Sequence, residues 1–409
     1  MTEAGGDRTV VPRGSAAEVF AAFLKLGLTS FGGPIAHLGY FHREIVERRR
    51  WIDDSHFGQL VALCQFLPGP ASSQLGFALG LIRAGWAGAI AAFIAFTAPS
   101  AVLLLAFARL LPELERPLGQ AAVHGLKLVA VVVVAAGLIS MVRRLTPDVA
   151  RRLMAAGAAA IVVMHGTAAV QLLIVGCGAL LGLAFCRSVD MPSGTTFSLR
   201  YTGRTGALVL SAFAGLLAIA LLPASLLSPG VSVAAAFYRA GALVFGGGHV
   251  VLPLLEQAVV APGWLDKQEF LAGYGAAQAV PGPMFSLAAF LGARLGAPLG
   301  GLAWAGVSLA AIFLPGLLLV AGTLPFWRAI ASDHRAGSAL AGVNAAVVGL
   351  LAAAFYDPVW TSAVLTPADF ATALAGFALL AAARAPVLIV LAFCVLSSMA
   401  RVWLVNGPA

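Results

Sequence analysis

The stretch from Gln65 to Gln74 reads Q-F-L-P-G-P-A-S-S-Q and interrupts a long apolar part of the chain. Proline lacks a backbone N–H and its ring clashes with the preceding helical turn, so the two prolines around Gly69 cannot lie within a continuous helix. Backbone N–H and C=O groups that lose their helical hydrogen bonds are tolerated in a bilayer only inside protein or beside a water-filled cavity. We therefore predict a helix break that marks a binding site at membrane depth. A simple kink, or a loop outside the bilayer, is the alternative interpretation.

Composition places the rest of the chain in a membrane. Charged residues make up 10% and hydrophobic residues 60% of the 409 residues, against about 25% and about 45–50% in a soluble domain. This length accommodates about a dozen apolar segments of about 20 residues each. The net charge is +8, but the basic residues lie in short loops, where they indicate the cytoplasmic side of a membrane. Nucleic-acid binding is therefore not expected.

Signatures of cofactor chemistry are missing from the sequence. The four cysteines show no C-x-x-C spacing, and the seven histidines form neither H-E-x-x-H nor H-x-H. No phosphate-cradling G-x-x-x-x-G-K occurs either. We expect no metal, no other cofactor and no ATP coupling.

The P-G-P motif occurs twice. Residues 278–286 read Q-A-V-P-G-P-M-F-S, which repeats the first copy at an offset of 213. Upstream, F-G-G at 31–33 recurs at 245–247, and W-I-D at 51–53 recurs as W-L-D at 264–266. One unit has therefore been duplicated. Such repeats are common in secondary transporters, whose binding sites form between the repeats at discontinuous helices.

The duplication defines the expected domains: a polar tail at 1–15, a first repeat at 16–187, a linker with an unpaired helix at 188–229, and a second repeat at 230–405. The expected spanning helices are 86–111, 119–141, 149–165 and 167–186, matched in the second half by 299–324, 336–356, 368–383 and 386–405. The unpaired helix is expected at 207–227. With an even number of crossings in each repeat, this one extra crossing inverts the second repeat.

The distribution of arginine agrees with inversion, because Lys and Arg prefer cytoplasmic loops. The loop at 42–51 holds four arginines, whereas its counterpart at 254–268 holds only Lys267. The loop at 142–152 also holds four, and its counterpart at 357–368 holds no basic residue. The sequence thus predicts an all-α polytopic membrane protein with two inverted repeats. Placing both arginine-rich loops inside requires re-entrant hairpins at F-G-G and P-G-P. The alternative is thirteen full crossings with one basic loop outside.

Three basic residues lie well inside apolar segments, where charge is costly and usually functional. They are Lys25, Lys127 and Arg239, and no acidic residue has a comparable position in the sequence. The buried charge is therefore expected to be positive and suited to an anion. Snorkelling of Lys25 and Arg239 to lipid headgroups is the alternative.

The helix breaks add a second means of binding an anion. Pro70 and Pro283 are placed to begin half-helices, whose free amides and dipole would face the ligand together with nearby serine hydroxyls. The glycines would let the backbone approach closely. The candidate substrate-binding residues are Lys25, Arg239, Gly32, Gly33, Gln65, Pro68, Gly69, Pro70, Ser72, Ser73, Gly246, Gly247, Gln278, Pro281, Gly282, Pro283 and Ser286. His37 and His249 are candidates for a proton relay or for hydrogen-bonded interfacial groups, and Lys127 is a candidate third cation.

Taken in order, these motifs resemble the chromate ion transporter family in its long bacterial form with two fused homologous domains. The resemblance is carried by F-G-G-P-I-A-H at 31–37, R-R-W-I-D at 49–53, Q-F-L-P-G-P at 65–70, A-P-S at 98–100, F-G-G-G at 245–248, W-L-D at 264–266, Q-A-V-P-G-P at 278–283 and F-L-P-G at 313–316. It implies proton-driven efflux of chromate across the bacterial inner membrane and resistance to chromate. It also implies a relation to sulfate handling, because both ions are tetrahedral dianions.

Other functions remain open at this point. Import or exchange of sulfate or another small anion fits the same residues, and so does an anion channel. From a different class, an intramembrane reductase could use Cys64 beside Gln65, although no nucleophile and base pair accompanies it in the sequence. The expected partners are a small oxyanion, protons and the bilayer. Assembly as a homodimer is left open.

Overall fold

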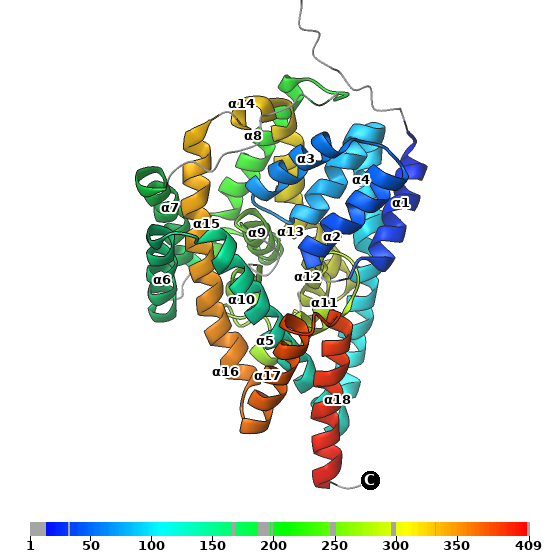
Figure 1. Ribbon diagram of the computed structural model, residues 1–409, viewed down its shortest axis with the longest axis vertical. Helices are drawn as coiled ribbons and strands as arrows, with labels where there is room; N and C mark the ends of the chain where they lie inside the picture. The colour runs from blue at the N-terminus through cyan, green and yellow to red at the C-terminus, as the bar shows by residue number, and fades with distance from the viewer. Residues whose placement is uncertain are drawn as a thin grey trace, which may run out of the picture.

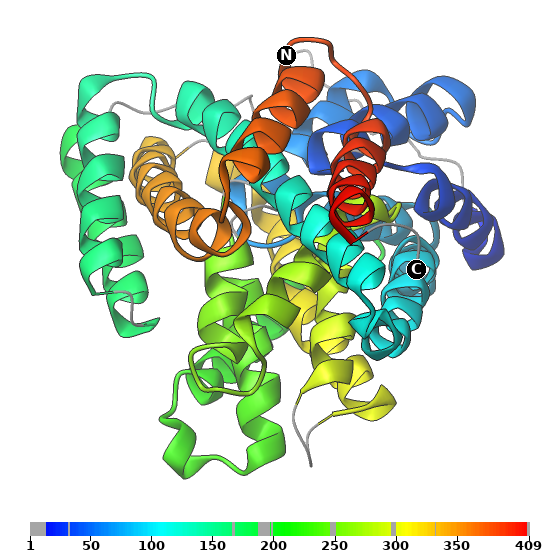
Figure 2. The same ribbon diagram turned by 90° about the horizontal axis from the view of Figure 1, so that it is seen from below.

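The computed structural model describes residues 14–31, 33–165, 168–186, 197, 199–245, 251–295, 300–331 and 333–406. The described residues form helices and connecting turns and contain no strand, as Figures 1 and 2 show. The main helices are α1 (Ala16–Thr29), α2 (Gly33–Phe41), α3 (Asp54–Phe66), α4 (Ala71–Leu110), α5 (Pro117–Leu145), α6 (Val149–Met164), α7 (Ala168–Phe185), α8 (Gly203–Ala220), α9 (Pro229–Ala242), α10 (Val251–Val259), α11 (Lys267–Ala279), α12 (Leu287–Arg294), α13 (Leu302–Thr323), α14 (Trp327–Ala331), α15 (His334–Ala354), α16 (Thr361–Ala363), α17 (Pro367–Ala381) and α18 (Val387–Asn406).

Short irregular turns complete the path of the chain. They are the π-helical segments His42–Arg48 (η1) and Phe355–Trp360 (η7), and the 3-10 turns Leu111–Glu115 (η2), Ala224–Leu226 (η3), Met284–Ser286 (η5) and Leu324–Phe326 (η6). Six helices among the described residues are long and apolar enough to cross a membrane. The predicted all-α polytopic fold is confirmed. The unpaired helix is shorter than predicted, because α8 ends at Ala220 and Pro223 follows.

The first repeat begins with two hairpins, one from α1 to η1 and one from α3 to the first part of α4. Both hairpins start and finish at the same end of the molecule. Glu18, in the first turn of α1, accepts a 3.0 Å hydrogen bond from Trp51 Nε1, and Arg83 Nη2 lies 3.1 Å from the same oxygen. Trp51 lies between the two hairpins and Arg83 near the end of the second, so all three points lie together. The F-G-G and P-G-P segments are therefore re-entrant, and the interpretation with thirteen full crossings is wrong.

The chain reverses again inside α4. Gly85 has φ +68°, a left-handed conformation that only glycine adopts easily. Around this reversal, a Cβ placed on Gly80 would lie 2.4 Å from the carbonyl oxygen of Gly88. The two parts of α4 thus touch through their backbones, and the part after Gly85 is the first full span.

The second repeat has the same construction. α9 and α10 form one hairpin and α11 and α12 the next, with Glu269 and Arg294 ion-paired across the two arms of the latter. A Cβ on Gly292 of α12 would lie 2.4 Å from the carbonyl oxygen of Trp304 in α13, so here too the segment after the P-G-P turn touches the following span through a glycine. The sequence repeat is therefore also a structural repeat.

The repeats run in opposite directions and interlock. Figure 1 shows the second part of α4 running down to the end where α5 begins, whereas its counterpart α13 runs up to α14 at the top. α5 of the first repeat packs on α17 and α18 of the second, and α15 packs on α6 and α7 of the first. The equivalent glycines Gly125 and Gly342 make these contacts, the former against Val395 and the latter against Gly178. Each repeat therefore completes the packing of the other.

Candidate functional site

The hairpins of the two repeats meet in the interior. The backbone N–H of Gly69 donates to the carbonyl of Val244 over 2.7 Å, and the N–H of Gly282 donates to the carbonyl of Ser30 over 2.9 Å. Gly69 and Gly282 are the central residues of the two P-G-P motifs, and Ser30 and Val244 each precede an F-G-G motif. These reciprocal hydrogen bonds join each P-G-P turn to the residue that precedes the F-G-G motif of the opposite repeat. We call this region the hairpin crossing.

Glycine is required at both turns for conformation and for space. Gly69 has φ +125° and Gly282 has φ +98°, a region that other residues enter only with strain. A Cβ at Gly69 would lie 3.0 Å from Cα of Gly316, and one at Gly282 would lie 3.0 Å from Oγ of Ser100. Gly316 and Ser100 follow the equivalent prolines of α13 and α4. Each P-G-P turn thus packs against the proline-containing span of the other repeat.

Side chains reinforce this crossing. Gln74 Nε2 donates to the carbonyls of Pro68 and Gly316 over 2.9 and 3.1 Å. On the opposite side, the hydroxyls of Ser100 and Ser286 lie 2.6 Å apart. Pro70 directly precedes α4, as predicted for a residue that begins a half-helix. Pro283 instead precedes the 3-10 turn η5, which leads into α12.

Several buried polar atoms near the crossing have no hydrogen-bond partner among the residues that the structure describes. They are Ser30 Oγ, His37 Nδ1, Ser73 Oγ, Gln74 Oε1 and Thr97 Oγ1. All five residues are at most 2% exposed. A buried polar atom without a partner is costly, and most native proteins satisfy such atoms with protein groups, water or a ligand. The crossing therefore offers unused hydroxyl, amide and imidazole groups to a small polar ligand.

His37 is the titratable residue at the crossing. Its Nε2 lies 3.2 Å from the carbonyl of Ser30, and its ring stands edge-on to Phe96 with centroids 5.4 Å apart. This hydrogen bond requires a proton on Nε2, which leaves Nδ1 as the acceptor in the neutral ring. His37 thus combines burial with one ring nitrogen that can take up a proton.

Lys25 does not have the surroundings that the sequence suggested. Its Nζ lies 2.7 Å from Oε2 of Glu44, whose side chain is only 6% exposed and also pairs with Arg48 and Arg49. The expectation that the buried charge is only positive is therefore wrong. The hairpin fold buries the carboxylate of Glu44, which pairs with Lys25, whose own side chain is 49% exposed.

Arg239 lies in a different setting. It is half-buried on α9 and lines a small cavity of about 50 Å³ together with Gln171 of α7 and Gln257 of α10. Among the described residues Arg239 forms no ion pair. The two equivalent cations are thus held in unequal environments.

Lys127 belongs to a third place, a cavity of about 1140 Å³ among α5, α11, α12, α17 and α18. There it donates a hydrogen bond to Gln268. Asp369 on the same wall pairs with His124 at 2.9 Å and with Arg401 at 2.7 Å. In Figure 1 the labels of α5, α11, α17 and α18, which line this cavity, lie below those of α1 and α3. We refer to it as the lower vestibule.

The other candidates divide into three groups. Ser72, Ser73 and Ser286 are buried at the crossing, and Gly33 begins α2 with φ +80°. Gln65 is exposed, and Gln278 donates to Sδ of Met284 over 3.3 Å, so neither side chain reaches the unpartnered groups. Gly32, Gly246, Gly247 and His249 lie outside the described residues.

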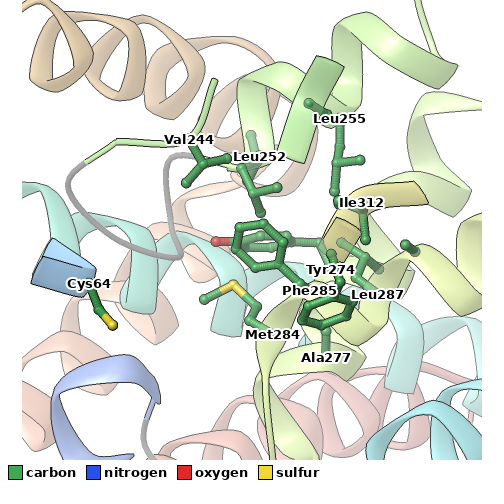
Figure 3. Close-up of a cluster of buried hydrophobic side chains, with 14 of the residues drawn as sticks. Cys64, Val244, Leu252, Leu255, Tyr274, Ala277, Met284, Phe285, Leu287 and Ile312 are labelled. Carbon is green, nitrogen blue, oxygen red and sulfur yellow. The ribbon is translucent and has the colours of Figure 1, made fainter. Parts of the chain in front are cut away.

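Cys64 lies in an apolar environment. It is 1% exposed, and Figure 3 places it in the cluster that includes Val244, Met284 and Phe285. No general base among the described residues forms a hydrogen bond with it. This setting gives no support to a reductase that uses Cys64.

Sequence reasoning missed several polar residues of the crossing, among them Ser30, Gln74, Thr97 and Ser100. Gln74 stands at the end of the quoted P-G-P segment, and Thr97 and Ser100 flank Pro99. A signal was therefore present, since a polar residue next to a proline in an apolar span is uncommon. Repeat symmetry could not find them, because Leu287 and Gly316 stand at the positions equivalent to Gln74 and Ser100.

A sequence model of the chromate transporter family matches residues 17–183 and 231–399, and so covers most of both repeats. The chain belongs to the chromate transporter family. It is 30% identical over 351 residues to a probable chromate transport protein of Synechococcus elongatus, covering 84% of this chain and 85% of that protein. A chromate transport protein of Pseudomonas aeruginosa is 28% identical over 373 residues, covering 88% of this chain and 84% of that protein.

A third relative, the chromate transport protein of Cupriavidus metallidurans, is 27% identical over 355 residues, with coverage of 86% and 85%. No solved structure matches the chain. The family resemblance predicted from the sequence is confirmed. Family membership and the six apolar helices make the chain a multi-pass bacterial membrane protein.

Proposed function

We propose that this protein is a secondary active transporter that exports chromate across the cytoplasmic membrane in exchange for protons, and that it thereby confers chromate resistance. The observation that carries the proposal is the hairpin crossing, where re-entrant segments of two oppositely directed repeats meet and leave buried polar atoms without partners. The family and the names of its relatives support chromate as the substrate.

Inverted repeats offer a physical route to alternating access. Two equivalent halves of opposite direction can exchange conformations, which opens the shared centre first to one face and then to the other. The crossing joins the halves through only a few hydrogen bonds at turns, so it can separate without unfolding a span. By the positive-inside rule, the arginine-rich loops face the cytoplasm and the lower vestibule opens outside. Anions would then leave the crossing through the vestibule.

The crossing also has groups that suit a tetrahedral oxyanion. The hydroxyls of Ser30, Ser73 and Thr97 can each donate one hydrogen bond. The amide ends of the half-helices add further donors and a positive dipole. His37 can carry the exchanged proton, because its Nδ1 is buried and unpartnered there.

The test uses everted membrane vesicles from cells that express the protein. Radiolabelled chromate is expected to accumulate in vesicles with an acidic interior, because the proton gradient then drives substrate in the direction of export. His37→Gln keeps a side chain that can bond the carbonyl of Ser30 but cannot titrate near neutral pH. This variant is expected to lose gradient-driven accumulation while retaining exchange of labelled for unlabelled chromate.

Two outcomes would contradict the proposal. Chromate flux no greater than in vesicles without the protein would exclude the substrate, and flux that ignores the proton gradient would indicate a channel or an anion exchanger. Unlabelled sulfate is included as a competitor, since sulfate is a dianion of the same shape. If sulfate were transported and chromate were not, the protein would be a sulfate transporter.

A further inference from the structure

Lys25 and Arg239 occupy equivalent positions in the two repeats, at an offset of 214, yet within the described part of the chain only Lys25 has a carboxylate partner. In the first repeat, Glu44 neutralises Lys25 at 2.7 Å and is itself held by Arg48 and Arg49. This cluster ties α1 to η1 within one hairpin. With both of its carboxylate oxygens engaged, it is a structural ion-pair network rather than a place for an anion.

The second repeat has no carboxylate at the position equivalent to Glu44. The offset between the repeats changes from 214 at F-G-G to 213 at W-x-D, so Glu44 corresponds to Gln257 or to Ala258. Both residues line the cavity beside Arg239. The neighbouring Glu256 forms no ion pair with Arg239 within the described part of the chain. With either offset, a neutral residue stands in the place of the acid.

The cavity beside Arg239 is small and has mainly apolar walls. Its volume is about 50 Å³, and Gln171 on α7, which is 4% exposed, supplies a second amide beside that of the partly buried Gln257. Val175, Leu243 and Leu254 form apolar parts of its lining. A space of this size holds one small ion or a few waters. It is too small for a nucleotide or for an organic acid of several carbons.

We propose that Arg239, Gln171 and Gln257 form a charged oxyanion-binding site beside the hairpin crossing, and that Lys25 with Glu44 is its neutralised structural counterpart in the other repeat. The ligand class is a small inorganic oxyanion, with chromate and sulfate as the probes. This inference rests on the proposed function. It makes the two repeats unequal in substrate binding, because only the second repeat supplies the positive charge that attracts the anion.

The chemistry of the three side chains fits this ligand. The guanidinium of Arg239 is a planar fork that can donate two parallel hydrogen bonds to two oxygens of one oxyanion. The amides of Gln171 and Gln257 can each donate to further oxygens. Apolar walls lower the local dielectric, which strengthens the attraction between the guanidinium and an anion.

The position of Arg239 connects this site to the crossing. Arg239 precedes Val244 by five residues, and the carbonyl of Val244 accepts the hydrogen bond from Gly69. The cavity lining also includes Leu243, which directly precedes Val244 in the chain. An anion bound at Arg239 would therefore lie next to the turn that has to separate during transport.

The decisive variant is Gln257→Glu, which gives the second repeat the carboxylate that the first repeat has. We measure chromate and sulfate binding to the purified full-length protein in detergent by titration calorimetry, with chloride as a third probe. Gln257→Glu and Arg239→Gln are expected to weaken oxyanion binding by about tenfold or more, because each removes the net positive charge of the site. Gln257→Asn, which keeps an amide, is expected to lose only a few-fold.

Two further variants make the comparison specific. Arg328→Gln removes an exposed arginine of α14 away from the cavity and is expected to leave affinity unchanged. Lys25→Gln is expected to lose less affinity than Arg239→Gln, since Glu44 already neutralises Lys25. Size-exclusion chromatography of each variant establishes that it is folded.

Three results would overturn the site: no binding of either oxyanion to the wild-type protein, unchanged binding in folded Gln257→Glu, or equal losses in Lys25→Gln and Arg239→Gln. The vesicle assay separates this failure from failure of the proposed function. Chromate export without dependence of binding on Arg239 would remove the site and keep the function. Oxyanion binding that depends on Arg239, in a protein that shows no proton-driven export, would support the site and contradict the proposed function.

Discussion

At the scale of single residues, the central feature is the pair of glycines in the P-G-P motifs. Gly69 and Gly282 have positive φ and donate the two backbone hydrogen bonds of the hairpin crossing. Each also lies against the opposite repeat, where a side chain would meet Gly316 or Ser100. Glycine at these positions therefore serves conformation, close packing and the contact between repeats together.

This gives a prediction for Gly69→Leu and Gly282→Leu. A non-glycine residue at positive φ costs about 1–2 kcal/mol, before the clash of the added side chain is counted. We expect each variant to lower the melting temperature in detergent by several degrees and to reduce chromate flux by at least about tenfold.

The control is Gly157→Leu, because a Cβ at Gly157 of α6 would meet no atom within 4 Å. It is expected to insert and transport as the wild type does. Wild-type flux in a Gly69→Leu, Gly282→Leu double variant would show that these turns are ordinary kinks with no part in transport.

At the scale of elements, the re-entrant hairpins depend on contacts at their open ends. Glu18 connects the start of α1 to Trp51 and Arg83, which are separated from it by 33 and 65 residues. Arg83 also lies over the ring of Trp51, with its guanidinium carbon 5.1 Å from the centroid. In the second repeat, Glu269 and Arg294 join the arms of a hairpin in a comparable way. Such charged contacts fix both arms at one membrane face.

Glu18→Gln tests this role. The change removes the ion pair with Arg83 and leaves a weaker acceptor for Trp51, and hydrogen bonds to charged groups are worth about 1.5–3 kcal/mol. We expect a lower melting temperature and faster proteolysis of the segment before α3. The membrane-spanning helices are still expected to insert. Glu113→Gln, at an exposed residue of η2, provides the control. Equal stability of the two variants would show that Glu18 does not hold the hairpins.

At the scale of the whole molecule, inversion and interlocking follow from each other. The α5 helix packs on α17 and α18, while α15 packs on α6 and α7. Neither repeat could bury these faces alone, so the repeats are expected to fold as one unit. The two P-G-P turns reach the centre from opposite faces because the repeats point in opposite directions.

Sidedness gives the prediction at this scale. Single cysteines are placed at three exposed residues in a background without the native cysteines: Arg50 and Leu365, in connecting segments, and Arg144, in the last turn of α5. A membrane-impermeant thiol reagent is expected to label Arg50→Cys and Arg144→Cys only from the cytoplasmic side and Leu365→Cys only from the outside. Labelling of Arg50→Cys and Arg144→Cys from opposite sides would contradict the hairpins. Labelling of Arg144→Cys and Leu365→Cys from one side would contradict the inversion.

The sequence by itself determined the membrane class, the duplication and the helix breaks. These follow from composition, from self-similarity at a fixed offset, and from the missing N–H of Pro68, Pro70, Pro281 and Pro283, all of which are local properties. It also determined the direction of the repeats. Each repeat crosses the membrane an even number of times, so one extra spanning helix between them inverts the second repeat. The arginine-rich loops indicate which side of each repeat faces the cytoplasm.

Only the tertiary structure decided the electrostatics of the site. Lys25 and Arg239 match in sequence, but the charge near each depends on which residue a re-entrant hairpin brings alongside, Glu44 in one case and Gln257 in the other. The unpartnered groups of Ser30 and Thr97 likewise come together only where segments from both repeats cross. Coulomb interactions and hydrogen bonds depend on distances of a few ångströms between residues far apart in the chain, and only packing fixes such distances.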